Sequence, residues 1–481
     1  MINTRFIASI LGRLLCLESA FMLPCCLLAI VTGGKDAAGL VLSFVITLAA
    51  GVTVARAVRV DDRLLSRRDG YFIVTATWIA FTLFGSLPYL LGHSIASPVD
   101  ALFETMSGFT TTGSTILDNI ESIPPATLLW RAITQWLGGI GIIVLFIALL
   151  PGLGIEGRDL YVAEVTGPIH DKSSNTFAAT ARHAWTLYIA LTLAQCLLLV
   201  AGDMGWFDAA CHSLTTMSSG GYSTKQDSIA HWDSAYIHYI FILFMFISGT
   251  NFGLLAAIFR GRSRRLFRDN EFRLYAAITL LAAILLAAGL ATAGREPTRA
   301  FRDALFQVTS ILTSTGFSTS DYLSWPPLLG AVILLLFLVG GCAGSTAGGI
   351  KCIRLLLLFK NSIAEMKRAL HPRAVILVKY NDRGVHPAVM TGVTGFFVLF
   401  MIIFGLSSLV MSSFTDDVET ACSAVISALC NTGPGFGAIG PAATHAALPD
   451  AAKLFLTLLM LVGRLEIFTV LVLFTRTFWK K

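Results

Sequence analysis

The chain has 481 residues, of which 55% are apolar and only 13% are charged. Soluble proteins carry roughly 25% charged residues, so this composition excludes an ordinary soluble protein and indicates an integral membrane protein. The net charge of +6 is modest, and the arginines and lysines cluster in particular loops. That distribution fits membrane topology, and we expect no nucleic-acid partner.

The first apolar runs predict two transmembrane helices. A helix needs about 20 mostly apolar residues to cross a bilayer, and Ile7–Val31 and Leu40–Ala57 meet that requirement. The next segment, Arg56–Asp69, is rich in arginine and is therefore expected on the cytoplasmic side. We treat 1–69 as an N-terminal unit that precedes a repeated part.

A short hydroxyl-rich motif with a central glycine occurs four times in the rest of the chain. The copies lie about one hundred residues apart, which indicates a fourfold internal repeat. The central glycines are Gly113, Gly220, Gly316 and Gly433, within the segments Phe109–Thr115, Thr216–Tyr222, Leu312–Ser318 and Cys430–Gly435.

Each copy lies between two long apolar segments, so each repeat is predicted to consist of a helix, a re-entrant pore loop and a second helix. We expect an all-α polytopic membrane protein with four such repeats around one central pore and two extra N-terminal helices. Ten crossings would place both termini inside, with all four glycine loops entering from the outer face. The repeats are expected at 70–182, 183–271, 272–386 and 387–481. Their helices are expected at Tyr71–Leu91 and Ala126–Leu150, Ala184–Val200 and Tyr236–Phe259, Leu274–Ala293 and Leu328–Phe359, and Ala388–Met411 and Leu454–Phe478.

The four glycine motifs are candidates for an ion-selective filter. Glycine adopts positive φ without a Cβ penalty, so a short loop around it can turn successive carbonyls toward one axis. Four such loops would make rings of carbonyl oxygens that can replace the hydration shell of an ion the size of K⁺. The alternative is that small residues merely let membrane helices pack closely. The candidate potassium-binding residues are Thr111, Thr112, Gly113, Ser218, Ser219, Gly220, Gly221, Ser314, Thr315, Gly316, Asn431, Thr432 and Gly433.

The second apolar segment of the third repeat, Leu328–Phe359, is longer than one crossing requires and has a glycine-rich middle. Each glycine costs close to 1 kcal/mol relative to alanine in a helix, so we expect two helices joined by a loop at membrane depth below the filter. Such a loop would be a gate or a plug, and a close-packed small-residue helix is the alternative. Lys351 either belongs to this loop or extends to the inner interface. The candidate gate residues are Gly340, Gly341, Gly344, Ser345, Thr346, Gly348, Gly349, Lys351 and Arg464.

Arg464 lies near the middle of the last predicted crossing. A charge at that depth normally faces a cavity or a partner. It could be a barrier charge beside the ion path, or it could hold the interrupted loop through backbone carbonyls. The remaining alternative is an Arg–Glu pair that ties helices together.

Several of these segments resemble the Trk/Ktr/HKT superfamily of cation transporters, most closely its bacterial Trk branch. The resemblance rests on Phe103–Gly113, Arg131 with Gln135–Gly141, Gly220–Ser223, the glycine-rich stretch before Ile350-Lys351, and Gly463–Thr469. It implies potassium uptake across the bacterial inner membrane, with K⁺ as the bound ion and no organic cofactor in this chain. Glycine at all four filter positions favours K⁺ over Na⁺ within this resemblance. It further implies that Gly340–Gly349 is a gate with Arg464 near it, that the chain pairs as a homodimer, and that a cytoplasmic nucleotide-binding subunit of the TrkA type regulates it.

Two other functions compete with a pore. A secondary transporter would couple K⁺ or Na⁺ uptake to H⁺ or Na⁺, and Glu18 and Glu466 are the obvious acids in apolar surroundings that could carry a proton. Neither belongs to a relay that the sequence identifies. A membrane enzyme is not expected, because the sequence has no HExxH motif, no nucleophile–base pair and no paired carboxylates at one depth.

Overall fold

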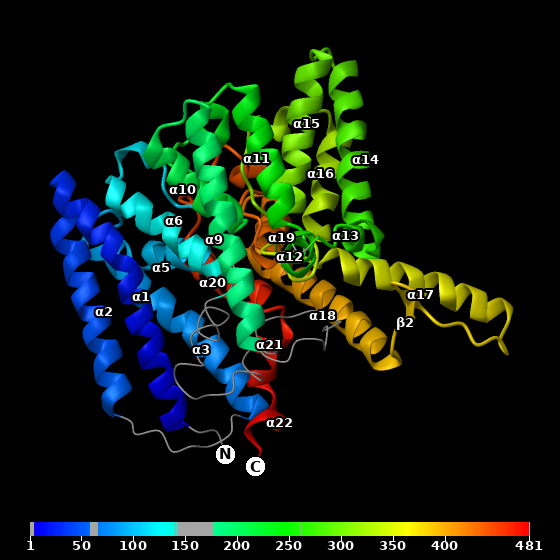
Figure 1. Ribbon diagram of the computed structural model, residues 1–481, viewed down its shortest axis with the longest axis horizontal. Helices are drawn as coiled ribbons and strands as arrows, with labels where there is room; N and C mark the ends of the chain where they lie inside the picture. The colour runs from blue at the N-terminus through cyan, green and yellow to red at the C-terminus, as the bar shows by residue number, and fades with distance from the viewer. Residues whose placement is uncertain (1–3, 58–65, 140, 142–176, 260, 481) are drawn as a thin grey trace.

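The computed structural model describes residues 4–57, 66–139, 141, 177–259 and 261–480. Over these residues the chain is almost entirely helical, as Figure 1 shows. The exception is a small antiparallel hairpin, β1 (Lys379–Tyr380) and β2 (Arg383–Gly384). The expected all-α fold class is therefore confirmed.

Two long helices begin the described chain. Helix α1 (Thr4–Thr32) packs along α2 (Ala37–Ala57), and both lie at one side of the molecule (Figure 1). Their backbones approach closely where Gly12 faces Gly51, because a Cβ on either glycine would collide with the other helix. Small residues at such crossings let membrane helices pack without a driving force from water.

The four predicted repeats contain the same sequence of elements. The first helices are α3 (Arg67–Gly85) with α4 (Leu87–Leu91), α9 (Phe177–Ala201), α14 (Asn270–Thr292) and α18 (Pro387–Met411). The short helices that follow are α5 (Pro98–Phe109), α10 (Trp206–Met217), α15 (Pro297–Leu312) and α19 (Val418–Cys430). The second helices are α6 (Pro125–Gly139), α11 (Ala235–Ser248) with α12 (Phe252–Phe259), α16 (Pro327–Val339) with α17 (Cys352–Leu370), and α20 (Asp450–Arg464) with α21 (Phe468–Leu471).

Among the described residues, six helices are long and apolar enough to span a membrane, and two bent pairs would raise that number to eight. The ten crossings expected from the sequence include two further segments. The structure divides Leu328–Phe359 into two helices, and the part of Ala126–Leu150 after Gly139 lies almost wholly outside the described residues. Much of the basic segment 56–69 and of the polar segment before α9 lies outside them as well.

The second helices correct the sequence analysis at two places. Tyr236–Phe259 and Leu454–Phe478 were expected to be continuous, but α11 and α12 meet at an angle of 107°, and α20 meets the helical turns after it at 108°. Both breaks occur at small or strained residues, with Gly249 at one and with Glu466 and Ile467 in positive φ at the other. As a result Arg464 ends a helix instead of lying in the middle of one. Most helices begin a few residues before the expected start, and the largest difference is at α9, which begins at Phe177 instead of Ala184.

The core of the repeated part is formed by the short helices α5, α10, α15 and α19, which are buried over most of their lengths. Longer helices surround them, so their polar side chains are shielded from lipid. Helix α17 does not pack around this core along its length. It extends away from the bundle with the β-hairpin beside it (Figure 1). The start of α1 and helix α22 (Arg476–Trp479) lie at the same end of the molecule (Figure 1).

Candidate functional site: a ring of four glycine loops

After each short buried helix the backbone takes the same unusual shape. A non-glycine residue in the left-handed region is followed two residues later by a glycine with positive φ. The pairs are Thr111 (φ 54°) and Gly113 (85°), Ser219 (57°) and Gly221 (74°), Ser314 (54°) and Gly316 (81°), and Asn431 (52°) and Gly433 (100°). Left-handed residues other than glycine are uncommon and mark functional or strained positions.

This pattern corrects the alignment of the second repeat. The sequence motif put Gly220 at the central position, but the backbone shows that Gly221 is the counterpart of Gly113. Gly220 instead occupies the position that threonine fills in the other three loops, at Thr112, Thr315 and Thr432. Two adjacent glycines made the motif ambiguous by one residue, and only the φ angles resolve the register.

The four loops contact one another in a closed ring. A Cβ added to Gly113 would collide with the carbonyl oxygen of Gly220 in the next repeat. In the same way, a Cβ on Gly221 would collide with the Thr315 carbonyl oxygen of the third loop, and a Cβ on Gly316 would collide with the Thr432 carbonyl oxygen of the fourth loop. A Cβ on Gly433 would meet the Thr112 carbonyl oxygen at 2.7 Å. Thr112 belongs to the first loop, so this contact closes the ring. Four loops that each touch the next in this order must surround a common axis.

Side chains fix neighbouring loops against each other. Between the fourth and first loops, Asn431 Nδ2 donates to Thr112 Oγ1 at 2.9 Å, and Ser114 Oγ donates to the Gly433 carbonyl at 3.0 Å. Between the first and second repeats, Gln135 Nε2 donates to the Gly220 carbonyl at 2.7 Å, and its Oε1 accepts from the Tyr222 backbone N–H at 3.0 Å.

The ring offers oxygen atoms to a cation. Among the described residues, the carbonyl oxygens of Thr112, Thr315 and Thr432 accept no hydrogen bond, and the buried Thr432 hydroxyl also has no partner. Unpaired buried oxygens are costly unless something else binds them. In addition, α5, α10, α15 and α19 all end at the ring with their C-termini, where the helix dipole favours positive charge. These features fit a dehydrated monovalent cation as cargo.

A buried ion pair braces the outer side of the ring. Arg131 Nε lies 2.6 Å from Glu104 Oε1, and both side chains are almost fully buried. Glu104, on α5, also accepts hydrogen bonds from the Thr115 hydroxyl and the Ile116 N–H. Arg131, on α6, donates to the Ser223 carbonyl at 2.9 Å. The pair thus ties the segments that follow the first and second loops to the rigid helices behind them.

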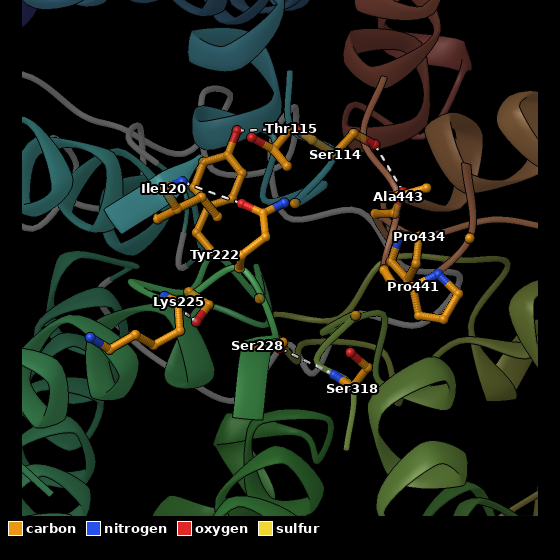
Figure 2. Close-up of a pocket in the computed structure, with 18 of the residues that line it drawn as sticks. Ser114, Thr115, Ile120, Tyr222, Lys225, Ser228, Ser318, Pro434, Pro441 and Ala443 are labelled. Atoms are coloured by element: carbon orange, nitrogen blue, oxygen red, sulfur yellow. Dashed lines mark hydrogen bonds between the residues drawn. The ribbon is translucent and has the colours of Figure 1, made fainter. Parts of the chain in front are cut away.

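Above the ring lies a cavity to which all four repeats contribute. Figure 2 shows Ser114, Tyr222, Ser318 and Pro434 arranged around it, each one or two residues after the positive-φ glycine of its own loop. Arg131 also lines this cavity. The cavity therefore opens directly onto the ring, on the side of the ring where Arg131 lies.

On the opposite side of the ring, residues 340–351 form a non-helical segment, which we call the intramembrane loop. The expectation of an interrupted helix is confirmed, and the alternative of a continuous small-residue helix is wrong. The loop touches three of the four glycine loops. The Thr346 hydroxyl lies 2.8 Å from the Ser219 hydroxyl, the Gly348 N–H donates to Ser314 Oγ at 2.5 Å, and the Gly349 N–H donates to the Cys430 carbonyl at 3.0 Å.

Two basic residues proposed for the gate contact this loop. Arg464 Nη1 donates to the Thr346 carbonyl at 3.0 Å, and Nη2 donates to the Gly139 carbonyl at 2.7 Å. The structure thus places Arg464 on backbone carbonyls of the loop, one of the three arrangements considered. Lys351 is buried and its Nζ donates to the Ala347 carbonyl, so it folds back over the loop. Glu466 pairs with Arg354 on α17.

The sequence analysis missed several residues of this site. Glu104, Arg131 and Gln135 were noted only as parts of family-like segments, although two charges and an amide within apolar runs were a signal of buried partners. Glu104 and Glu271 are buried acids in addition to Glu18 and Glu466. Nothing in the local sequence indicated that Glu271 reaches the intramembrane loop, because the two are far apart in the chain.

The geometry defines a class: integral membrane proteins in which four helix–pore-loop–helix units surround one axis. Comparison of the chain with known proteins supports this class. Residues 40–481 match the TrkH family model, described as a cation transport protein. The chain is 40% identical to the Trk system potassium uptake protein TrkH of Halomonas elongata over the full length of both chains, and 39% identical to that of Escherichia coli K12 over 99% of both.

A solved structure is similar as well. The crystal structure of the potassium transporter TrkH from Vibrio parahaemolyticus superimposes with a TM-score of 0.90 at 37% identity, covering 99% of this chain and 100% of that one. The chain belongs to the TrkH family of cation transport proteins. The resemblance seen in the sequence is confirmed, the family consists of transporters and not of enzymes, and the chain is a multi-pass inner-membrane protein.

Proposed function

We propose that this chain mediates potassium uptake through the ring of glycine loops. The observation that carries the proposal is the closed contact between the four loops around a common axis, in which the carbonyl oxygen of the equivalent residue in one loop lies against the positive-φ glycine of its neighbour. A cation on that axis would exchange its hydration shell for these oxygens. Relatives that share the whole length of the chain are named potassium uptake proteins, which supports K⁺ as the cargo.

The ring acts as the selectivity filter in this proposal. Thr111 to Gly113, Ser218 to Gly221, Ser314 to Gly316 and Asn431 to Gly433 supply the carbonyl and hydroxyl ligands. Glycine is needed at the four positive-φ positions because the backbone of the neighbouring loop leaves no room for a side chain. The hydrogen bonds around the ring keep its diameter fixed, and a fixed diameter favours an ion of one size.

The intramembrane loop acts as the gate. It lies against the inner side of the filter, and its contacts to Ser219, Ser314 and Cys430 hold it across the ion path. Arg464 supports this closed position through the Thr346 carbonyl. To open, the loop must break its hydrogen bonds to the three glycine loops and take another conformation. Glycine makes such a change of backbone conformation easier, because it has no Cβ and can adopt many φ angles.

We also propose the partners that the family resemblance implies. The chain pairs as a homodimer and is regulated by a cytoplasmic nucleotide-binding subunit of the TrkA type. The relatives are named as parts of a Trk system, which supports further subunits. Native mass measurement of the purified chain tests the dimer, since a monomeric mass would contradict it. Addition of a purified TrkA-type subunit, with and without nucleotide, tests the regulation.

Ion flux into proteoliposomes tests the filter. The native chain should take up K⁺ or Rb⁺ much faster than Na⁺. In Gly113→Ser the new Cβ meets the Gly220 carbonyl at a positive φ, and backbone strain costs roughly 1–3 kcal/mol. We therefore expect the K⁺/Na⁺ ratio to fall about tenfold, the change that corresponds to 1.4 kcal/mol. Gly405→Ser on α18 is the matched control, because a Cβ there meets nothing within 4 Å.

Two results would contradict the proposal. An unchanged ion preference in Gly113→Ser would remove the first loop from the filter. Uptake that follows an imposed proton or sodium gradient, at constant membrane potential and constant K⁺ gradient, would instead support the alternative of a coupled symporter.

A further inference from the structure

Glu271 lies in the first turn of α14 and is almost completely buried, with 2% of its surface exposed. Its Oε1 accepts a hydrogen bond from the Ala343 backbone N–H at 2.6 Å and a second from the Ile353 backbone N–H at 3.1 Å. Ala343 is near the start of the intramembrane loop, and Ile353 follows its end. One carboxylate therefore holds both ends of the loop.

The chemistry of this contact favours a strong bond. Hydrogen bonds from backbone N–H groups to a carboxylate are roughly twice as strong as bonds between neutral groups. The Ile353 N–H lies in the first turn of α17, where helical N–H groups have no partner within the helix and where negative charge is favoured. The Cys352 N–H also donates to the Gly341 carbonyl at 3.0 Å, so the two ends are closed on each other next to Glu271.

The same turn of α14 contacts the β-hairpin on its other side. Asp269 caps α14 through the Phe272 N–H at 2.9 Å, and its second oxygen accepts from the Tyr380 hydroxyl at 3.1 Å and from Asn381 Nδ2 at 2.7 Å. Asn381 Oδ1 in turn accepts from the Asn270 N–H at 2.9 Å. The hairpin and the intramembrane loop are thus attached to one helical turn, two residues apart.

We propose that Glu271 is a positioning residue that clasps the two ends of the intramembrane loop, and that the first turn of α14 links this clasp to the β-hairpin. The inference rests on the proposed function, in which the intramembrane loop is the gate. Releasing Glu271 separates Ala343 from Ile353 and lets the loop leave the inner side of the filter. Moving the hairpin moves Asp269 and Asn270, and with them Glu271.

Two native cysteines report on the clasp without any measurement of transport. Cys342 and Cys352 lie next to Ala343 and Ile353, carry free thiols and are fully buried. The experiment measures their rates of modification by a membrane-permeant maleimide in proteoliposomes, resolved by peptide mass spectrometry, together with Rb⁺ flux. Cys25, buried in α1, is the internal reference for general loosening of the fold.

We expect Glu271→Ala to raise the labelling rate of Cys342 and Cys352 about tenfold, because loss of bonds worth more than 1.4 kcal/mol shifts an opening equilibrium by that factor. Glu271→Gln keeps an acceptor oxygen and should give an intermediate rate. Glu365→Gln, on the exposed side of α17, is the matched control and should label like the native chain. If Glu271→Ala does not fold, as judged by gel filtration, Glu271→Gln carries the test.

The two readouts separate the clasp from the gate. Native labelling rates at Cys342 and Cys352 in both folded Glu271 variants would overturn the clasp. Faster labelling there with unchanged Rb⁺ flux would support the clasp and overturn the gate. Equal acceleration at Cys25 would show a general loss of packing and would overturn the positioning role.

Asn381→Ala tests the link to the hairpin. It removes the two hydrogen bonds that Asn381 makes with Asp269 and Asn270, while leaving the Tyr380 bond to Asp269 and the carboxylate of Glu271 in place. We expect Cys342 and Cys352 to label faster than in the native chain but more slowly than in Glu271→Ala. A native rate at both cysteines would overturn the link.

Discussion

Four loops with the same backbone shape touch one another in a ring, whereas a single loop from the third repeat lies against one side of that ring. The loops of the ring repeat the same pair of positive-φ residues. The intramembrane loop has no counterpart among the described residues, and the breaks after α11 and α20 are much shorter.

The contrast suggests how one repeated chain serves two tasks. Selectivity requires equivalent ligands on all sides of an ion, which duplication supplies. A gate requires one part that can move while the ring stays fixed. The second helices end at Gly139, Ser248, Val339 and Arg464, and among the connections that the structure describes after these ends, the one after Val339 is the longest and folds against the ring. The ends at Ser248 and Arg464 supply contacts for it, because the Ser248 carbonyl accepts from the Thr346 N–H at 3.3 Å and Arg464 donates to the Thr346 carbonyl at 3.0 Å.

The largest effect is expected from breaking the buried brace of the outer ring. Glu104→Gln leaves the Arg131 guanidinium without its carboxylate, and removing one partner of a buried ion pair costs roughly 3–5 kcal/mol. We expect a large decrease in thermal stability, measured in detergent, and loss of K⁺ uptake. Glu365→Gln is the control, since its exposed pair with Arg368 contributes less than about 1 kcal/mol. Equal stability of the two variants would mean that the pair does not support the ring.

The next prediction concerns the register of the second loop. Gly221 has φ 74° and a Cβ there would collide with the backbone of Thr315, whereas the nearest atoms to a Cβ on Gly220 would belong to the side chain of Gln135. The Gln135 side chain can shift at the cost of its hydrogen bonds to Gly220 and Tyr222, whereas a shift of the Thr315 backbone would deform the neighbouring loop. Gly221→Ala should therefore reduce K⁺/Na⁺ selectivity about tenfold, for a strain of roughly 1–3 kcal/mol, and Gly220→Ala should reduce it less. The reverse order of the two flux ratios would restore the register read from the sequence.

How much of this the sequence could predict differs between the two sides of the pore. The four glycine loops could be found because repeated motifs are visible in one dimension, and the glycine-rich break was visible because glycine is a poor helix former. The one-residue error at Gly220 arose because neighbouring glycines are chemically alike and only φ distinguishes them. The bends after Ser248 and Arg464 were missed because each polar stretch, Ser248–Asn251 and Gly463–Glu466, is short and has a long apolar run before it and apolar residues after it. Contacts such as Glu271 with Ala343 depend on tertiary packing, which local sequence does not encode.

On the inner side, the hydroxyl of Thr346 holds the intramembrane loop against the filter. It bonds to the Ser219 hydroxyl and donates toward the Met217 carbonyl at 3.0 Å. Thr346→Val removes these bonds at nearly constant volume, and each contributes about 0.5–1.5 kcal/mol. We expect Rb⁺ flux without any regulatory subunit to rise several-fold. Ser345→Ala is the comparison, because the Ser345 hydroxyl donates only within the loop, to Cys342, and should change flux less. Equal flux in both variants would argue against this docking contact.

The smallest effect is expected at the outer rim, where Asp417 caps α19. Its carboxylate accepts from the Thr420 N–H at 2.6 Å and from the Thr420 hydroxyl at 2.7 Å, and these bonds hold the pKa of Asp417 below its ordinary value. A carboxyl whose pKa falls on folding contributes stability above its unfolded pKa of about 3.9, and this stability is lost as the pH falls through the folded pKa.

Melting temperatures between pH 7 and pH 3 test this contribution. Asp417→Asn keeps an acceptor for the cap but cannot ionise, so it should be slightly less stable than the native chain at pH 7, by less than about 1 kcal/mol. The two curves should converge at low pH. Asp416→Asn is the control, because the Asp416 side chain accepts no hydrogen bond from a residue that the structure describes. A constant difference across the pH range would show that the cap works through geometry alone, and that the rim, unlike the ring below it, does not depend on charge.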